Sequence, residues 1–163
     1  MEKDIIQKEI EKARDAKCFF AELALALTIP SVCSRYGLDD EELKSLRESK
    51  RYPEWYEKYV YPQYQFLTGK ECYAVRCAIL HNGDVDLYSQ SILRHESKIN
   101  NYRLMIPEYG DNFCLQYEEN SQLQDRPFCA AALAMKILDG YEKFKSEHPE
   151  FKYPLYSYDS EHQ

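Results

Sequence analysis

Apolar residues at the start of the chain recur at alternating steps of four and three, which places them on one face of a helix. This spacing predicts one long amphipathic helix over residues 4–29, with Lys17 in the one polar slot of the face. Residues 19–29 are apolar nearly all round, so we expect this half to lie deep in the core. Pro30 is expected to end the regular pattern. The residues of the face are Ile6, Ile10, Ala13, Phe20, Ala24 and Leu27.

Two shorter helical patterns follow. Residues 39–48 begin with consecutive acids, which the helix dipole favours, and this predicts a short surface helix with a solvated start. A second helix is predicted to begin near Tyr52, with Pro53 in its first turn, and to end at Pro62. Its aromatic residues keep helical spacing, so we expect them to pack in the core and leave their hydroxyls at the rim. They are Tyr52, Trp55, Tyr56 and Tyr59.

A third helix is predicted over residues 68–81. Thr68 can cap it, and Glu71 stands three residues further on, which fits a capping box. Asn82 and the glycine after it are typical of a left-handed helix stop. We expect residues 84–100 to be mostly loop.

The periodicity then changes from helical to alternating. Residues 101–118 contain two alternating runs around a turn-rich loop, which predicts a β-hairpin. A last helix is predicted over residues 126–147, with Asp125 as its cap. Together these patterns predict a mainly α fold with one domain over residues 1–150. Residues 151–163 are expected to form a flexible or loosely docked tail.

Composition narrows the function classes. The net charge of −7 and the sequence pI near 5.2 argue against a surface built to hold nucleic acid constitutively, but they allow a local basic site. The six cysteines form no C-x-x-C pair and no zinc-type cluster with histidine, so we expect reduced thiols, no metal and no cofactor.

The charged N-terminus lacks the apolar core of a secretory signal. The longest apolar stretch is interrupted by Glu22 and is shorter than the ~20 residues that span a bilayer. We therefore expect a cytoplasmic protein without a membrane partner.

Arg76 and His81 are the strongest candidates for functional residues. They lie five positions apart, about 140° around an α-helix, so they are not stacked neighbours. Both can still border one cleft, especially if a second copy of the chain brings the same pair across a two-fold axis. A histidine can exchange a proton with a ribose 2′-hydroxyl or a leaving oxygen at neutral pH. An arginine can hold the phosphate in a planar fork, and no metal is needed.

The stretch from Glu71 to Gly83, ECYAVRCAILHNG, resembles the R-x4-6-H motif of HEPN domains. A weaker likeness to small bacterial proteins of the HEPN-like type covers about residues 18–140. The resemblance implies a helical bundle that forms a homodimer, with the predicted hairpin as an insertion. It implies RNA as a partner and a metal-independent ribonuclease activity, as in toxins and phage-defence effectors.

The same resemblance assigns roles to individual residues. Arg76 is the expected phosphate clamp and His81 the expected general acid and base, with Tyr73, Cys77 and Asn82 as supporting neighbours. Many HEPN nucleases place Asn, Asp or His directly after the arginine, where this chain has Cys77. A thiol is a poor substitute for orienting a phosphate or a histidine.

Other readings of the same residues stay open. The helical body can serve as a non-catalytic module that binds a protein partner through its aromatic surface. Cys77 and His81 can form a thiol enzyme, although no orienting third residue is evident. In a purely structural reading, the helix dipole favours His81 in the last turn, and Arg76 pairs with an acid such as Glu71 or Glu22.

Overall fold

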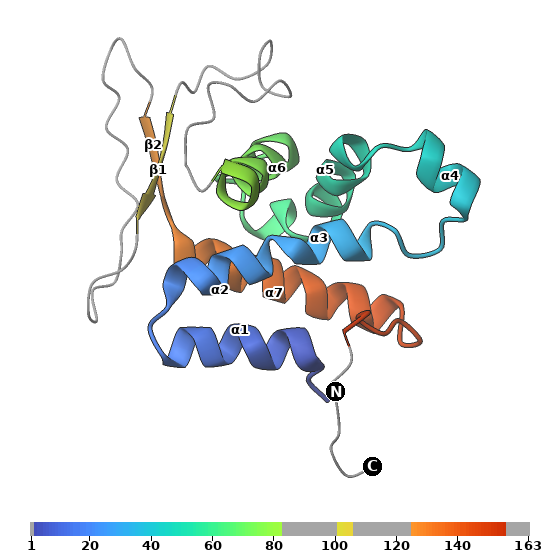
Figure 1. Ribbon diagram of the computed structural model, residues 1–163, viewed down its shortest axis with the longest axis horizontal. Helices are drawn as coiled ribbons and strands as arrows, with labels where there is room; N and C mark the ends of the chain where they lie inside the picture. The colour runs from blue at the N-terminus through green and yellow to red at the C-terminus, as the bar shows by residue number, and fades with distance from the viewer. Residues whose placement is uncertain (1, 83–100, 106–124, 156–163) are drawn as a thin grey trace.

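The computed structural model describes residues 2–82, 101–105 and 125–155, and in this part of the chain the fold is mainly helical, as predicted (Figure 1). The elements, in chain order, are α1 (Ile5–Asp15), α2 (Phe19–Ala26), α3 (Thr28–Cys33), α4 (Asp40–Ser45), α5 (Glu48–Tyr59), the 3-10 helix η1 (Tyr61–Gln63), α6 (Gly69–Cys77), the π-helix η2 (Ala78–Asn82), β1 (Asn101–Met105), β2 (Asp125–Cys129) and α7 (Ala130–Glu147).

The predicted single helix over residues 4–29 is wrong, because the chain turns back after α1. Lys17 adopts a left-handed backbone conformation with φ of 57°. Its amide donates to the carbonyl of Arg14, and the amide of Cys18 donates to the carbonyl of Ala13, both at 2.8 Å. These two bonds form a Schellman motif, which ends a helix and reverses the chain. The apolar spacing continues across the break because α1 and α2 lie side by side and bury their faces in one core (Figure 1).

Pro30 was predicted to end the helical pattern, and this prediction is wrong. Pro30 lies in the first turn of α3, where a backbone N–H would have no partner within the helix, so a proline is tolerated.

The predicted surface helix after residue 38 is confirmed as α4, whose N-cap Asp39 forms a complete capping box with Glu42. The next helix, α5, begins at Glu48 rather than near Tyr52, and Pro53 therefore lies inside the helix. Pro53 removes one backbone donor there, and burial of its ring offsets part of that cost. The earlier start adds a turn to α5, and this turn contains Glu48.

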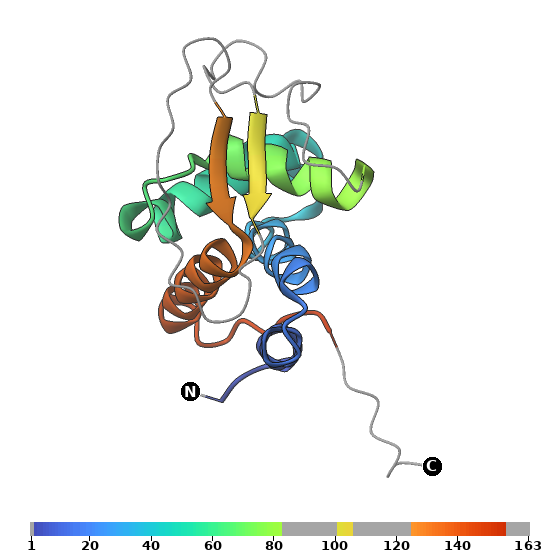
Figure 2. The ribbon, with the colours of Figure 1, turned by 90° about the vertical axis from the view of Figure 1, so that its left-hand side faces the viewer.

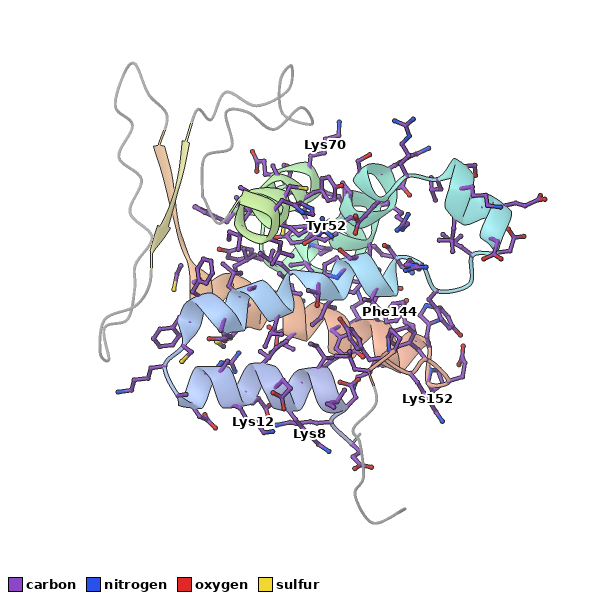
Figure 3. The ribbon with its side chains drawn as sticks, in the orientation of Figure 1. Lys8, Lys12, Tyr52, Lys70, Phe144 and Lys152 are labelled. Atoms are coloured by element: carbon purple, nitrogen blue, oxygen red, sulfur yellow. The ribbon has the colours of Figure 1, made fainter. Side chains whose placement is uncertain are left out.

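The aromatic residues of α5 pack in the core, as predicted, but the hydroxyls of Tyr52 and Tyr56 are buried there and do not lie at the rim as expected. Tyr52 and Tyr56 are fully buried, and Trp55 and Tyr59 are nearly so. Helix α5 contacts α6, which lies beside it, and α3 and α7, which run beneath it in Figure 1. Tyr52 therefore lies between the helices at the centre of the molecule (Figure 3).

The strand pairing differs from a simple hairpin. β1 pairs in parallel with β2, in a register that joins Asn101 to Asp125 and Met105 to Cys129 (Figure 2). The last helix was predicted to begin at 126, but this segment is a strand, and α7 begins at Ala130 with Cys129 as its N-cap. The proline at position 127 biases the residue before it toward an extended conformation, which favours the strand.

Two predicted elements cannot be compared with the structure. The second strand of the predicted hairpin, within 113–117, and the predicted loop over 84–100 lie outside the described residues.

The first part of the predicted tail is docked against the helices. Tyr153 is buried, and its hydroxyl shares a 2.9 Å hydrogen bond with that of Thr28 at the start of α3. The ring of Phe151 packs edge-on against Tyr36 and Phe144, at 5.4 and 5.0 Å between centroids. Phe151 and Tyr153 therefore dock this segment on the helices, and residues 156–163 lie outside the described part.

Candidate functional site

Helix α6 carries the candidate residues, and a local capping signal fixes where it begins. The Thr68 hydroxyl accepts a hydrogen bond from the Glu71 amide at 3.2 Å, and the Glu71 carboxylate accepts one from the Thr68 amide at 2.8 Å. This is the predicted capping box. At its other end, α6 is followed directly by the π-helix η2, so the helical winding continues beyond Cys77.

The π-helix brings Arg76 and His81 into contact within one chain. The Nη1 atom of Arg76 lies 3.3 Å from the Nε2 atom of His81. In an α-helix these two positions would face directions about 140° apart. A π-helix winds more widely, with i to i+5 hydrogen bonds, so residues five apart come to the same side. Arg76 and His81 are thus direct neighbours, whereas regular α-helical spacing would separate them.

The contact is compatible with one tautomer of a neutral His81. A guanidinium has donors only, so Nε2 of His81 accepts when this bond is made, and the hydrogen of the neutral ring is then on Nδ1. The side chain of His81 is exposed, so a ligand in solvent can reach the ring.

Glu48 is the acidic partner of Arg76. The Nη2 atom of Arg76 lies 3.3 Å from the carboxylate of Glu48, at the first position of α5. The two side chains are only 15% and 28% exposed, so solvent screens this pair less than it would a surface pair. The predicted partners are wrong, because Glu71 caps α6 and Glu22 binds Arg14.

Tyr73 supports the guanidinium from one side. The Cζ atom of Arg76 lies 5.7 Å from the centre of the Tyr73 ring, which is cation–π distance. Tyr73 in turn packs edge-on against the buried ring of Tyr52, at 5.3 Å between centroids. Burial raises the pKa of Tyr73 to about 12, so its phenol is protonated at neutral pH. It can position a ligand as a hydrogen-bond donor, and it does not act as a phenolate base.

Cys77 lies on the same guanidinium, with its Sγ atom 3.9 Å from Nη1 of Arg76. Within the described residues, no hydrogen bond joins Cys77 to His81, because the contact of His81 goes to Arg76. The thiol-enzyme reading therefore gains no support from this geometry. Asn82 lies in the last position of η2, and its side chain is outside the described part of the chain.

One donor of the cluster is unused. The Nε atom of Arg76 is buried and has no hydrogen-bond partner among the described residues. Orphaned buried donors are rare in proteins. We refer to Glu48, Tyr73, Arg76, Cys77 and His81 together as the Arg76 cluster.

A cavity described in the structure lies elsewhere on the molecule. It has a volume of about 730 Å³ and lies between the start of α1 and residues 149–155, with Lys8, Lys145 and Lys152 in its wall. Lys8 and Lys152 are seen near the lower edge of Figure 3, away from α6. The Arg76 cluster is therefore a surface site and not the lining of this cavity.

Within residues 2–82, 101–105 and 125–155, no three His, Cys, Asp or Glu side chains gather as a group that could hold a metal ion. In the same ranges, no helix is both long and apolar enough to cross a bilayer.

Comparison of the chain with protein-family models, with curated proteins and with solved structures finds no match in any of the three.

Proposed function

We propose that the protein binds RNA and cleaves it without a metal ion, as a HEPN-like endoribonuclease. The observation that carries this proposal is the 3.3 Å contact between Arg76 Nη1 and His81 Nε2 at an exposed imidazole. The pair combines a fixed positive charge with a group that exchanges protons at neutral pH, which are the two functions that phosphodiester cleavage requires.

In the proposed reaction, a phosphodiester takes the Nη1 donor of Arg76 and frees Nε2 of His81. The freed Nε2 accepts the proton of the adjacent ribose 2′-hydroxyl, whose oxygen then forms a bond to phosphorus. The bond from phosphorus to the 5′-oxygen breaks and leaves a 2′,3′-cyclic phosphate, and the 5′-oxygen takes its proton from the protonated imidazole of the partner's His81. Arg76 stabilises the negative charge that develops on the phosphate oxygens.

The proposal includes a homodimer, in which a second copy of the chain completes the groove beside the Arg76 cluster. A monomeric enzyme would have to supply both proton transfers from His81 alone. The proposed context is a toxin or phage-defence effector, so expression of the active chain is expected to inhibit growth.

The test compares His81→Ala and Arg76→Ala with the unchanged chain, on single-stranded RNA in buffer with a chelator. We expect cleavage to fall by about 10²–10⁴ for His81→Ala and by about 10²–10³ for Arg76→Ala. Arg35→Ala, at an exposed position after α3, is the matched control and should keep full activity. Unchanged cleavage and growth inhibition in both cluster variants would overturn the proposal.

A second candidate is a non-catalytic module that binds a protein partner. It is favoured by one observation: Arg76 is only 15% exposed and is already paired with Glu48 inside the same chain. Under this reading, the folded chain neither binds nor cleaves RNA, and Arg76→Ala lowers its melting temperature without changing any activity toward RNA.

A further inference from the structure

The Arg76 cluster carries no net charge in its described geometry. Arg76 contributes one positive charge and Glu48 one negative charge 3.3 Å away. His81 is neutral when it accepts from Nη1, and the protonated Tyr73 adds none. A phosphate that binds here therefore meets a guanidinium whose charge is already balanced by a carboxylate.

This balance affects different phosphates unequally. A phosphodiester inside an RNA chain carries one negative charge, whereas a terminal phosphate monoester carries about −1.5 to −2 at pH 7. Repulsion by a fixed carboxylate grows in proportion to the charge of the ligand. The penalty that Glu48 imposes is thus up to twice as large for a monoester as for a diester.

Glu48 is held in place to exert this effect. It belongs to the first turn of α5, and α5 packs along α6, so the carboxylate and the guanidinium are presented to each other by two adjacent helices. The face of Tyr73 supports Arg76 from another side, which limits how far the guanidinium can swing away from Glu48. A ligand must bind beside the carboxylate or displace it.

We propose that Glu48 biases the phosphate specificity of this site: it weakens the binding of doubly charged terminal phosphate monoesters more than the binding of singly charged phosphodiesters. This inference rests on the proposed function of the Arg76 cluster and names the class of phosphate that the cluster accepts. Glu48 acts here as a specificity-determining residue through Arg76 and takes no part in proton transfer.

The test measures the binding of two probes that cannot be cleaved by attack of a 2′-oxygen. The diester probe is the 2′-O-methyl dinucleotide UpU without terminal phosphates, and the monoester probe is 2′-O-methyluridine 3′-monophosphate. Dissociation constants are read at pH 7 and low salt from the NMR signals of His81 in the full chain. The variants are Glu48→Gln and Glu48→Ala, which remove the charge, and Glu48→Asp, which keeps it. Glu54→Gln removes an equal charge at an exposed position of α5 and is the matched control.

The ratio of the two dissociation constants in the unchanged chain is the reference value for all variants. Loss of the carboxylate charge should strengthen diester binding by about threefold to tenfold and monoester binding by roughly the square of that factor. Glu48→Asp and Glu54→Gln should keep the original preference. Circular dichroism shows whether Glu48→Gln and Glu48→Ala are folded. If one of them folds poorly, the dissociation constants of the other test the inference.

Two outcomes overturn the inference, and they can be told apart. If the unchanged chain cleaves RNA and binds the diester, but neither uncharged variant alters the ratio of the two dissociation constants, Glu48 does not set specificity and the proposed function stands. If the unchanged chain neither cleaves RNA nor shows shifts of His81 with either probe, both the proposed function and this inference fall.

Discussion

Arg76 and His81 contact each other, Nη1 to Nε2 at 3.3 Å, because the helix that carries both changes from α to π geometry between them. Helix α6 is regular up to Cys77, and η2 then widens by the additional residue per hydrogen-bonded turn that a π-helix contains. The contact is therefore a property of the backbone as much as of the two side chains. His81 is exposed, and Arg76 also pairs with Glu48.

The hydrogen bond between these residues predicts the tautomer of His81. Since Arg76 can only donate, the hydrogen of the neutral ring should be on Nδ1, and nitrogen-15 NMR at neutral pH should show this directly. Arg76→Ala removes the donor, and the ring should then populate the Nε2-protonated tautomer. His148 packs between Tyr36 and Phe144 and serves as the internal control, with an unchanged spectrum. An Nε2-protonated His81 in the unchanged chain would contradict the contact.

The turn between α1 and α2 contains a residue that is strained by its side chain. Lys17 has a φ of 57°, a conformation in which a residue with a Cβ atom is disfavoured by roughly 1–2 kcal/mol. Lys17→Gly should therefore raise the free energy of unfolding by about 1 kcal/mol in a urea titration. Lys8→Gly is the control, because Lys8 lies within α1 on its outer face (Figure 3), where glycine should cost about 1 kcal/mol. A loss of stability in both variants would show that the left-handed turn is not strained.

Gly140 lies where α7 passes closest to the end of α5. A Cβ atom at this position would lie 2.8 Å from Val60 Cγ2 and 2.9 Å from the carbonyl oxygen of Tyr59, and the carbonyl cannot move without moving the backbone. Gly140→Ala should lower the free energy of unfolding by about 1–3 kcal/mol, although alanine is the better helix former. The measurement is thermal unfolding by circular dichroism. Asp139→Ala, at the neighbouring exposed position, should change stability by less than about 0.5 kcal/mol. Equal melting temperatures for the two variants would refute the close approach.

Glu22 predicts a pH dependence of stability. Its side chain is fully buried, and burial raises its pKa, while the hydrogen bond from Arg14 opposes that rise. Between the unfolded pKa near 4.5 and the raised folded pKa, the folded chain binds more protons than the unfolded chain. The contribution of Glu22 to stability must then fall as the pH rises through this window.

Comparison with Glu22→Gln isolates that contribution. The free energy of unfolding of the unchanged chain, minus that of the variant, should decrease as the pH is raised from about 4 toward 7. The measurement is urea unfolding of both proteins at a series of pH values. A difference that increases with pH would mean that Arg14 outweighs burial and lowers the pKa of Glu22.

Local signals in the sequence predicted the elements that depend on neighbours in the chain. The capping box predicted at Thr68 joins residues three positions apart, and it is present. The aromatic spacing of α5 predicted its buried face because a period of 3.6 residues is visible without knowledge of the partner helix. The candidate pair, Arg76 and His81, was likewise found from spacing within one segment.

Long-range packing decided the rest. A continuous apolar face fits one long helix or two helices that share a core, so the reversal at Lys17 follows from the packing of α1 on α2. The pairing of β1 with β2 joins segments far apart in the sequence. The partner of Arg76 could not be read from spacing, since Glu48 comes from another helix whose start is set by tertiary contacts.

The sequence by itself determined a mainly helical fold, the capping box of α6 and the candidate chemistry, because these follow from residues within a few positions of one another. Only the tertiary structure decided that Arg76 is neutralised by Glu48 and that His81 meets it across a π-turn. The physical reason is that charge pairing and helix winding depend on what the surrounding elements bury, and burial is a property of the folded chain as a whole.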